Sequence, residues 1–436
     1  MTDRRLDVWC FDEVAGMLVD GDDGLAFEYG GEWVAGGMPP LSQSLPVDGR
    51  FGSEAVVAFF GGLLPEGPPR QLLARQLGLS PSNDFSLLAA LGGDTAGAVS
   101  LLHPGDRPAH PGTDVRWLDD VDLARELDEL PTRPMHVHAA GEYRLSLAGV
   151  QDKLPVVVGA DGRIGLTEGG TPSTHILKTP IARLQDTVAN EAYCLAVGRA
   201  LGINAVEAEP RRVAGREFLL VRRYDRAGAP DATRRVHQED FCQALGIPAQ
   251  RKYQDEGGPG LVDLFGLIRS AVAVPARAAT ELLGYVALSF LVGNHDAHGK
   301  NYSLLYLPRS SRAELAPAYD VLGTVVYRKA QPMSRRMAMH IGGEYRPAYV
   351  RRRHLDRLID EAGLGGAAAR RRLRALASEA PTAARSVRSD LVRSGWDAPL
   401  LGRVVEIVAE RAGWLAELAA PAATGTRSAW PRSTSR

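Results

Sequence analysis

A short polar loop at residues 293–303, Gly-Asn-His-Asp-Ala-His-Gly-Lys-Asn-Tyr-Ser, holds the side chains of this sequence that are best suited to chemistry. Asp296 and Asn301 stand five positions apart, as do the base and the metal-binding asparagine of a protein-kinase catalytic loop. Asp320 follows nineteen residues after Asn301, behind a predicted strand, ELAPAY. A base, a metal-binding amide and a metal-binding carboxylate in this order are the catalytic parts of a phosphotransferase.

Two other interpretations of this loop stay open at the level of sequence. Asp, Asn, His and Gly are also the residues that ordinary turns favour. His295, Asp296 and His298 are possible metal ligands, although side chains this close in sequence can point at one ion only with unusual backbone geometry. The loop alone therefore does not decide among a turn, a metal site and a phosphotransferase.

An apolar run, LLGYVALSFLV at 282–292, is the element that would position the loop. It has no proline and is long enough for a buried helix. Gly293 follows it directly and suits the C-cap of such a helix. Polar side chains gathered in a short loop at the end of a core element serve function more often than packing.

Lysine is rare in this chain, because only five of the 51 basic residues are lysines and the rest are arginines. The five are Lys153, Lys178, Lys252, Lys300 and Lys329. Arginine cannot replace a compact ammonium group in a tight phosphate site. The rare lysines therefore indicate candidate phosphate-binding positions.

Length and composition narrow the class of protein. A chain of 436 residues should form two or three domains, and 45% hydrophobic with 24% charged residues is typical of a globular protein. The net charge of −1 excludes a molecule-wide field that attracts nucleic acid, so any basic face must be local. Three widely spaced cysteines predict no disulfide framework, and neither a signal peptide nor a run of membrane-spanning length is recognisable. We therefore expect a cytoplasmic protein with no membrane partner.

Periodicity and composition divide the chain into four parts. Residues 1–105 predict a compact α+β unit with three early strands. Residues 113–225 predict a small sheet with one helix, with Lys178 at the end of an inner strand, as in the small lobe of a kinase. Residues 226–420 are predicted to be mostly helical apart from the catalytic segment. Residues 421–436 have the composition of a disordered tail.

Eight short motifs stand in order along nearly the whole chain. They are SLAGVQDK (146–153), THILKTP (174–180), NEAYCLAVGRALG (190–202), VRRYDR (221–226), QEDFCQALGIP (238–248), KYQDEGGPG (252–260), GNHDAHGKN (293–301) and YDV (319–321). Together at these spacings they resemble the HipA family, the serine/threonine-kinase toxins of bacterial HipBA toxin–antitoxin modules. SLPVDG and FFGGLLPEGP resemble the N-terminal domain of the same family. The resemblance implies an α+β, protein-kinase-like two-lobed fold with a mixed α/β N-terminal domain and a mainly helical C-terminal lobe.

The resemblance also implies roles for individual residues. Asp296 would be the catalytic base, and Asn301 and Asp320 would hold Mg²⁺. The residues expected to bind ATP are Ala148, Gly149, Val150, Gln151, Asp152, Lys153, Lys178, Arg222, Arg223, Tyr224, His298, Gly299, Lys300, Asn301, Tyr319, Asp320, Val321 and Leu322. Ser146 matches the serine that family members autophosphorylate. From the residues themselves, Glu191 in the predicted helix 186–202 is the candidate ion-pair partner of Lys178.

We therefore expect an ATP- and Mg²⁺-dependent serine/threonine protein kinase that acts as a toxin and autophosphorylates. The resemblance implies a HipB-like helix-turn-helix antitoxin, operator DNA contacted through that complex, and a protein substrate from translation such as an aminoacyl-tRNA synthetase. One alternative is a small-molecule phosphotransferase of the same superfamily, and another is a catalytically weak co-repressor that acts with a DNA-binding antitoxin. The arginines Arg351, Arg352, Arg353, Arg357, Arg370, Arg371, Arg372 and Arg374 form either a solvated helical face or a contact with the DNA backbone.

Overall fold

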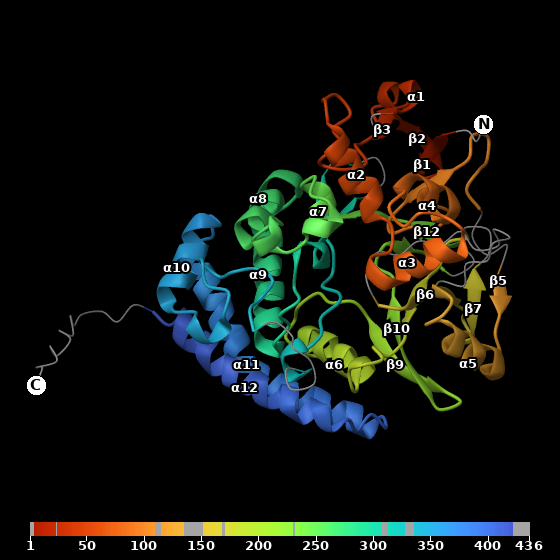
Figure 1. Cartoon of the computed structure of the whole chain (residues 1–436). Coiled ribbons are helices and arrows are strands. Elements are labelled where there is room, and N and C mark those ends of the chain that lie inside the picture. Colours follow the sequence, from red (N-terminus) through yellow and green to blue (C-terminus); the bar gives the residue numbers. More distant parts are fainter. Residues whose placement is uncertain are drawn as a thin grey trace, which may run out of the picture.

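The computed structural model describes residues 4–22, 24–109, 115–134, 151–167, 171–229, 232–306, 310, 312–327 and 335–421. Within this part of the chain, buried apolar side chains form three clusters: one in the N-terminal region, one in a central sheet and the largest in the C-terminal half. Figure 1 shows the N-terminal elements at the top, the central sheet at the lower right and the helical C-terminal part at the left.

The N-terminal region is an antiparallel sheet packed against helices. Its strands are β1 (Arg5–Cys10), β2 (Glu13–Gly21), β3 (Gly24–Tyr29) and β4 (Val99–Leu102), in the order β3-β2-β1-β4. Its helices are α1 (Gly31–Ala35), α2 (Ser53–Gly62), α3 (Gly67–Gln76) and α4 (Asp84–Leu91). Along β1 every second residue is buried, namely Leu6, Val8 and Cys10, so one face of the sheet forms the core.

The central region is a six-stranded antiparallel sheet. In sheet order its strands are β5 (Val115–Trp117), β7 (Ile164–Thr167), β6 (Lys153–Val158), β8 (His175–Lys178), β10 (Arg216–Arg222) and β9 (Ala208–Val213). Its helices are α5 (Asp120–Glu129) and α6 (Thr187–Ala200). Lys153 and Lys178 stand opposite each other on the paired strands β6 and β8. The register of this sheet therefore brings two of the rare lysines together.

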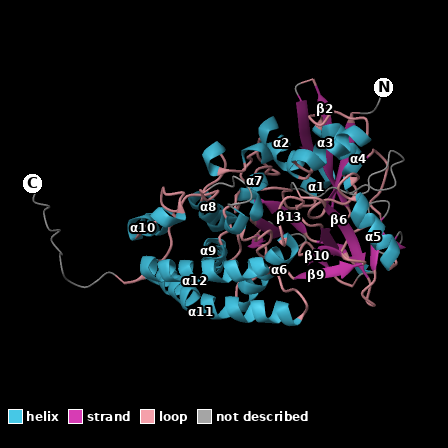
Figure 2. Ribbon diagram, turned by 60° about the horizontal axis from the view of Figure 1, so that its bottom comes forward, coloured by secondary structure: helices cyan, strands magenta, loops and turns pink. Residues whose placement is uncertain are grey.

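The C-terminal region is mainly helical and contains a small sheet. Its helices are α7 (Phe241–Ala244), α8 (Leu261–Ala271), α9 (Pro275–Val292), α10 (Arg352–Glu361), α11 (Gly366–Arg393) and α12 (Pro399–Ala419). Its strands are the pair β11 (Arg226–Ala227) and β12 (Arg234–Arg235), and the three-stranded sheet β13 (His237–Asp240), β14 (Ser303–Tyr306) and β15 (Ala313–Leu315). Helices α11 and α12 pack side by side, and α9 contacts both (Figure 2).

The predicted fold class is confirmed, and so are several of its elements. The three early strands, the predicted helix 186–202 and the buried helix before the catalytic loop are all present. Gly293 caps that last helix in the left-handed conformation, with φ of 76°. The expectation that the chain beyond Arg226 is mostly helical apart from the catalytic segment is incomplete, because it missed β13 and β14, whereas β15 overlaps the start of the predicted strand ELAPAY. The two missed strands have only four residues each, and all four residues of β13 are buried and polar, so neither length nor alternation indicated them.

The three cysteines, Cys10, Cys194 and Cys242, are buried free thiols. Among the helices in the described ranges, none combines the length and the apolar character needed to cross a membrane.

Candidate active site

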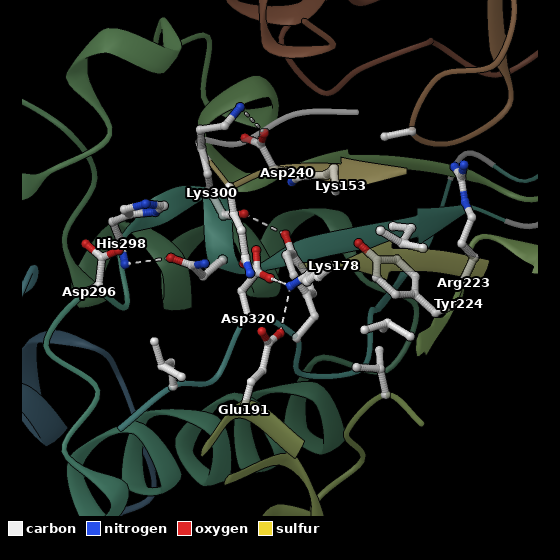
Figure 3. A pocket seen from close by; sticks show the side chains of 18 of the residues that line it. Lys153, Lys178, Glu191, Arg223, Tyr224, Asp240, Asp296, His298, Lys300 and Asp320 are labelled. Carbon is white, nitrogen blue, oxygen red and sulfur yellow. Dashed lines mark hydrogen bonds and ion pairs between the residues drawn. The ribbon is translucent and has the colours of Figure 1, made fainter. Parts of the chain in front are cut away.

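A cavity of about 370 Å³ lies where the three regions meet. Of the residues predicted to form the site, its lining includes Gln151, Lys153, Lys178, Arg222, Arg223, Tyr224, Asp296, His298, Lys300, Asn301, Tyr319, Asp320 and Leu322. Figure 3 shows Asp296 and His298 at one end of the cavity, Lys178 in the middle and Tyr224 toward the opposite end. The fold thus brings most of the predicted residues to one place.

Seven predicted residues are not among this lining: three lie outside the cavity, and four fall outside the described residues. Asp152, Gly299 and Val321 do not line the cavity: Val321 belongs to the apolar core, and Gly299 packs closely against Pro259 and Cys242. Ser146, Ala148, Gly149 and Val150, which carry the predicted phosphate-side loop and autophosphorylation site, lie outside the described residues.

The loop at residues 293–303, which is the predicted catalytic loop, is held by hydrogen bonds within itself. The amide of Asp296 donates to Asn294 Oδ1 at 2.9 Å, and the amide of His298 donates to Asn301 Oδ1 at 3.1 Å. These two asparagine side chains fix the backbone on both sides of Asp296. The Asp296 residue itself is exposed and lines the cavity, so its carboxylate is accessible to a substrate.

The side chains of His295, Asp296 and His298 do not converge on one point. His295 Nε2 lies 3.1 Å from a guanidinium nitrogen of Arg411 in the core. Asp296 accepts a hydrogen bond from the Tyr253 hydroxyl at 2.7 Å, and the His298 ring packs edge-on against the Tyr253 ring. Among the residues described, no group of three His, Cys, Asp or Glu side chains is arranged to hold a metal ion. The geometry therefore does not support the three-ligand metal interpretation of this loop.

Lys178 forms a buried ion pair with two carboxylates. Its Nζ lies 2.7 Å from Glu191 Oε1 and is also hydrogen-bonded to Asp320 Oδ1 (Figure 3). The ion pair predicted between Lys178 and Glu191 is thus confirmed. Although burial disfavours the ammonium form, Asp320 and Glu191 raise the pKa of Lys178 above its ordinary value, so the side chain stays charged. Burial also opposes ionisation of Asp320, but the Lys178 and Lys153 ammonium groups lower its pKa to about 2.

Asp320 is held in an uncommon backbone conformation. Its φ is 52°, in the left-handed region that aspartate tolerates better than most residues but still visits rarely. Its side chain is 41% exposed, even though one oxygen is bonded to Lys178. The carboxylate is therefore presented both to Lys178 and to the open part of the cavity. Backbone strain of this kind gathers at functional sites.

Four of the five lysines surround the cavity: Lys153, Lys178, Lys252 and Lys300. Each is largely shielded, and the most exposed, Lys252, has 13% of its side chain accessible. Burial lowers the pKa of Lys153 to about 8, although the nearby Asp320 carboxylate opposes this shift. Lys329 lies outside the described residues. Four of the candidate phosphate-binding lysines thus lie around one cavity.

Lys300 and Lys252 point toward the N-terminal region. Lys300 Nζ contacts Asp240 Oδ2 at 2.8 Å and the Gly62 carbonyl at 3.3 Å. Lys252 Nζ donates to Glu66 Oε2 at 2.9 Å, and Glu66 Oε1 lies 3.6 Å from Lys300 Nζ. Burial favours the neutral form of Glu66, but Lys300 and Lys252 lower its pKa below the ordinary value. An ionised carboxylate of the N-terminal region thus sits between two lysines of the cavity.

The segment expected to contact adenine is anchored by buried charges. Arg223 donates to Asp225 Oδ1 at 2.9 Å and lies 3.4 Å from Asp94 of the N-terminal region. Arg222 also lines the cavity, but its side chain is 61% exposed and pairs with Glu207 at 3.2 Å. Arg223 thus fixes the segment to the N-terminal region, while the guanidinium of Arg222 turns toward solvent.

Sequence reasoning assigned no role to Gly62, Glu66, Ala96 or Tyr253. The first three are N-terminal residues that line the cavity, and Tyr253 bonds to Asp296. Two motifs could have indicated Gly62, Glu66 and Tyr253: FFGGLLPEGP contains the first two, and KYQDEGGPG, which begins with a rare lysine, contains the third. The sequence alone does not show how these segments pack against the rest of the chain and so reach the cavity.

Comparison with known proteins places these observations in a family. Residues 6–102 match the model of the HipA N-terminal domain, and residues 145–384 match that of the HipA-like C-terminal domain. The Y4mE protein of Sinorhizobium fredii is 43% identical over 84% of this chain and 87% of its own length. The serine/threonine-protein kinase toxin HipA of Shewanella oneidensis is 32% identical over 78% of this chain and 79% of its own. A solved structure of Shewanella oneidensis HipA with HipB and operator DNA superposes with a TM-score of 0.81 at 28% identity, covering 95% of this chain and 99% of that one.

Proposed function

Because the chain belongs to the HipA family, we propose that it is a serine/threonine protein kinase that uses ATP and Mg²⁺ and acts as the toxin of a toxin–antitoxin pair. The observation that carries the proposal is the convergence of Lys178, Asp320 and Asp296 on one cavity. A cation for phosphates, a carboxylate for a metal and a base for a hydroxyl are what phosphoryl transfer requires.

The oxygen ligands and ammonium groups in the middle of the cavity suit the binding of Mg²⁺ and of the phosphates of ATP. Asp320 and Asn301 offer a carboxylate and an amide oxygen, which are ligands that Mg²⁺ prefers, and the exposed part of Asp320 is reachable from the cavity. Mg²⁺ would neutralise negative charge on the phosphates. Lys178, held by Glu191, would bind phosphate oxygens, with Lys153 beside it. Burial keeps these charge interactions strong, because little water screens them.

The two ends of the cavity would bind different groups: the adenine of ATP and the hydroxyl of the protein substrate. Ile176, Val221 and Leu322 line it together with the ring of Tyr224, and this apolar part would receive the adenine. Asp296 at the opposite end would orient the hydroxyl of a serine or threonine and accept its proton (Figure 3). The proposed catalysis is thus positioning and charge stabilisation, with little covalent work for the protein.

The proposed partners follow the family. The structurally similar HipA is held in a complex with HipB and operator DNA, which supports a helix-turn-helix antitoxin and an operator as partners of this chain. The proposed substrate is a protein of translation such as an aminoacyl-tRNA synthetase, with Ser146 as the site of autophosphorylation. A phosphate on Ser146 would add roughly −1.5 to −2 charges two residues before the expected phosphate-side loop and would weaken ATP binding.

The eight arginines of this region differ in their contacts and exposure, and Arg352 and Arg372 are only partly exposed. Arg370 and Arg374 of α11 donate to the carbonyls of Leu418 and Ala419 at the end of α12, so they stabilise the helical packing. Arg351, Arg353, Arg357 and Arg371 are exposed. A contact with the DNA backbone is therefore proposed for the exposed arginines only.

Incubation of the purified chain with radiolabelled ATP and Mg²⁺ tests the proposal. We expect label on the chain itself and on a protein substrate. Label that reaches only small molecules would indicate the small-molecule phosphotransferase instead. A chain that transfers no label, yet tightens the binding of its antitoxin to operator DNA, would indicate a co-repressor.

A further inference from the structure

Tyr253 makes a direct contact with the proposed catalytic base. Its hydroxyl donates to Asp296 Oδ1 at 2.7 Å, and its ring packs edge-on against His298, with ring centres 5.1 Å apart. Tyr253 belongs to the segment KYQDEGGPG, which lies beside the catalytic loop but outside it in sequence. From this geometry we infer that Tyr253 is a positioning residue that sets the orientation of the Asp296 carboxylate, an inference that rests on the proposed kinase function.

The contact supplies something that the catalytic loop itself lacks. Asn294 fixes the backbone amide of Asp296, but the carboxylate can still rotate about its last side-chain bond. A donor on Oδ1 selects one orientation, so that Oδ2 is the oxygen directed to a substrate hydroxyl. Burial, followed by the charge of Asp296, raises the pKa of Tyr253 above its ordinary value, so the hydroxyl keeps its proton and remains a donor at neutral pH.

The segment that carries Tyr253 is tied down on both sides. The amide of Gly299 in the catalytic loop donates to the Lys252 carbonyl at 3.3 Å, and the Lys252 ammonium is bound by Glu66. The amide of Gln254 donates to the Ala338 carbonyl at 3.3 Å, and the amide of Ala338 in turn donates to the His295 carbonyl at 2.9 Å. The tyrosine is therefore held from the catalytic loop and from the N-terminal region, as a group that must orient another side chain should be.

Tyr253→Phe removes the hydroxyl and keeps the ring against His298. We expect kcat for phosphoryl transfer to fall roughly tenfold, as for the loss of a hydrogen bond to a charged group, while KM for ATP and the melting temperature stay unchanged. Tyr345→Phe is the matched control, because its ring packs against His340 and Arg336, away from Asp296. This control should leave kcat unchanged.

A double-variant comparison separates positioning from a purely structural role. If Tyr253 acts through the Asp296 carboxylate, Tyr253→Phe should lower kcat in the parent chain but have little further effect in an Asp296→Asn chain. A Tyr253→Phe chain with the kcat of the parent, or one that loses ATP affinity and melting temperature along with kcat, would overturn the inference while leaving the kinase proposal intact. A parent chain that transfers no phosphate to any protein would overturn both.

Discussion

Asp296 and Asp320 both line the cavity, but their contacts differ, in keeping with the different roles proposed for them. Asp320 is bonded to Lys178 and is accessible to a metal, whereas Asp296 is bonded to Tyr253 at the far end. Asp296→Asn should therefore lower turnover by roughly 10²- to 10⁴-fold, as for the loss of a general base, with ATP affinity nearly unchanged. Asp320→Asn should also weaken Mg²⁺-dependent ATP binding. Calorimetry with ATP, with and without Mg²⁺, distinguishes the two, and an equal loss of Mg·ATP binding in both variants would contradict the assignment.

Lys153 gives the site a pH dependence of its own. Because its pKa is lowered to about 8, its amine is charged below that pH and neutral above it. The attraction for ATP phosphates should therefore weaken as pH rises through 8, over a range in which ATP is already fully ionised. The dissociation constant of Mg·ATP should rise between pH 7 and pH 9, roughly in the proportion set by a single titrating group. Lys153→Met should bind more weakly and show a flat profile, and an equally steep rise in that variant would contradict the prediction.

At the scale of elements, the junction between α2 and α3 reaches into the cavity through Glu66. Glu66→Gln removes the ionised partner of Lys252 and leaves Lys300 paired with Asp240 alone in a mostly buried place, and it should destabilise the fold by about 1–3 kcal/mol. Glu54→Gln is the matched control, because Glu54 pairs with Arg251 at the same interface but is 66% exposed. That change should cost less than about 1 kcal/mol. Thermal melting of both variants is the measurement, and equal shifts would show that Glu66 is no more than a surface partner.

Some helices and site residues could be predicted from the sequence, whereas contacts between distant segments could not. Helices α6 and α9 were predictable because each contains a long, largely apolar stretch that is followed by a glycine. Lys178, Glu191 and Asp320 could each be proposed as site residues from the segments that contain them, and the pair Lys178–Glu191 could be predicted, whereas the bond between Lys178 and Asp320 could not. Glu66, Asp94 and Tyr253 were not predictable, since their partners lie far away in sequence: Glu66 meets Lys252, and Asp94 meets Arg223. The contacts of Glu66 and Asp94 depend on how the N-terminal region packs against the rest of the chain, and that of Tyr253 depends on how its segment packs against the loop that holds Asp296. No local sequence pattern indicates either packing.

At the scale of the whole molecule, a net charge of −1 means that binding to DNA would depend on a local face. Replacing the exposed Arg353 and Arg371 by alanine should weaken operator binding of the antitoxin complex uniformly over sequences. It should reduce the slope of log affinity against log salt by about 2. Arg370→Ala with Arg374→Ala is the contrasting pair, which should lower the melting temperature, because these side chains bind the end of α12. Gel shifts at several salt concentrations test this, and an unchanged slope would return Arg353 and Arg371 to an ordinary solvated surface.

The gathering of the lysines around the cavity has a chemical consequence. Neutral primary amines such as that of lysine react with acylating reagents and are the substrates of acetyltransferases, whereas the guanidinium group of arginine is not acylated. Because four of the five lysines surround the cavity and are largely shielded, limited acetylation should modify these four slowly. Lys153, with its lowered pKa, should be the most reactive of the four, and Mg·ATP should protect it. Peptide mass spectrometry can follow this, and equal modification of Lys153 with and without Mg·ATP would contradict the proposed nucleotide site. Acylation of one lysine that lines the cavity would therefore remove a phosphate-binding charge and should abolish phosphoryl transfer, without changing the exposed surface of the protein.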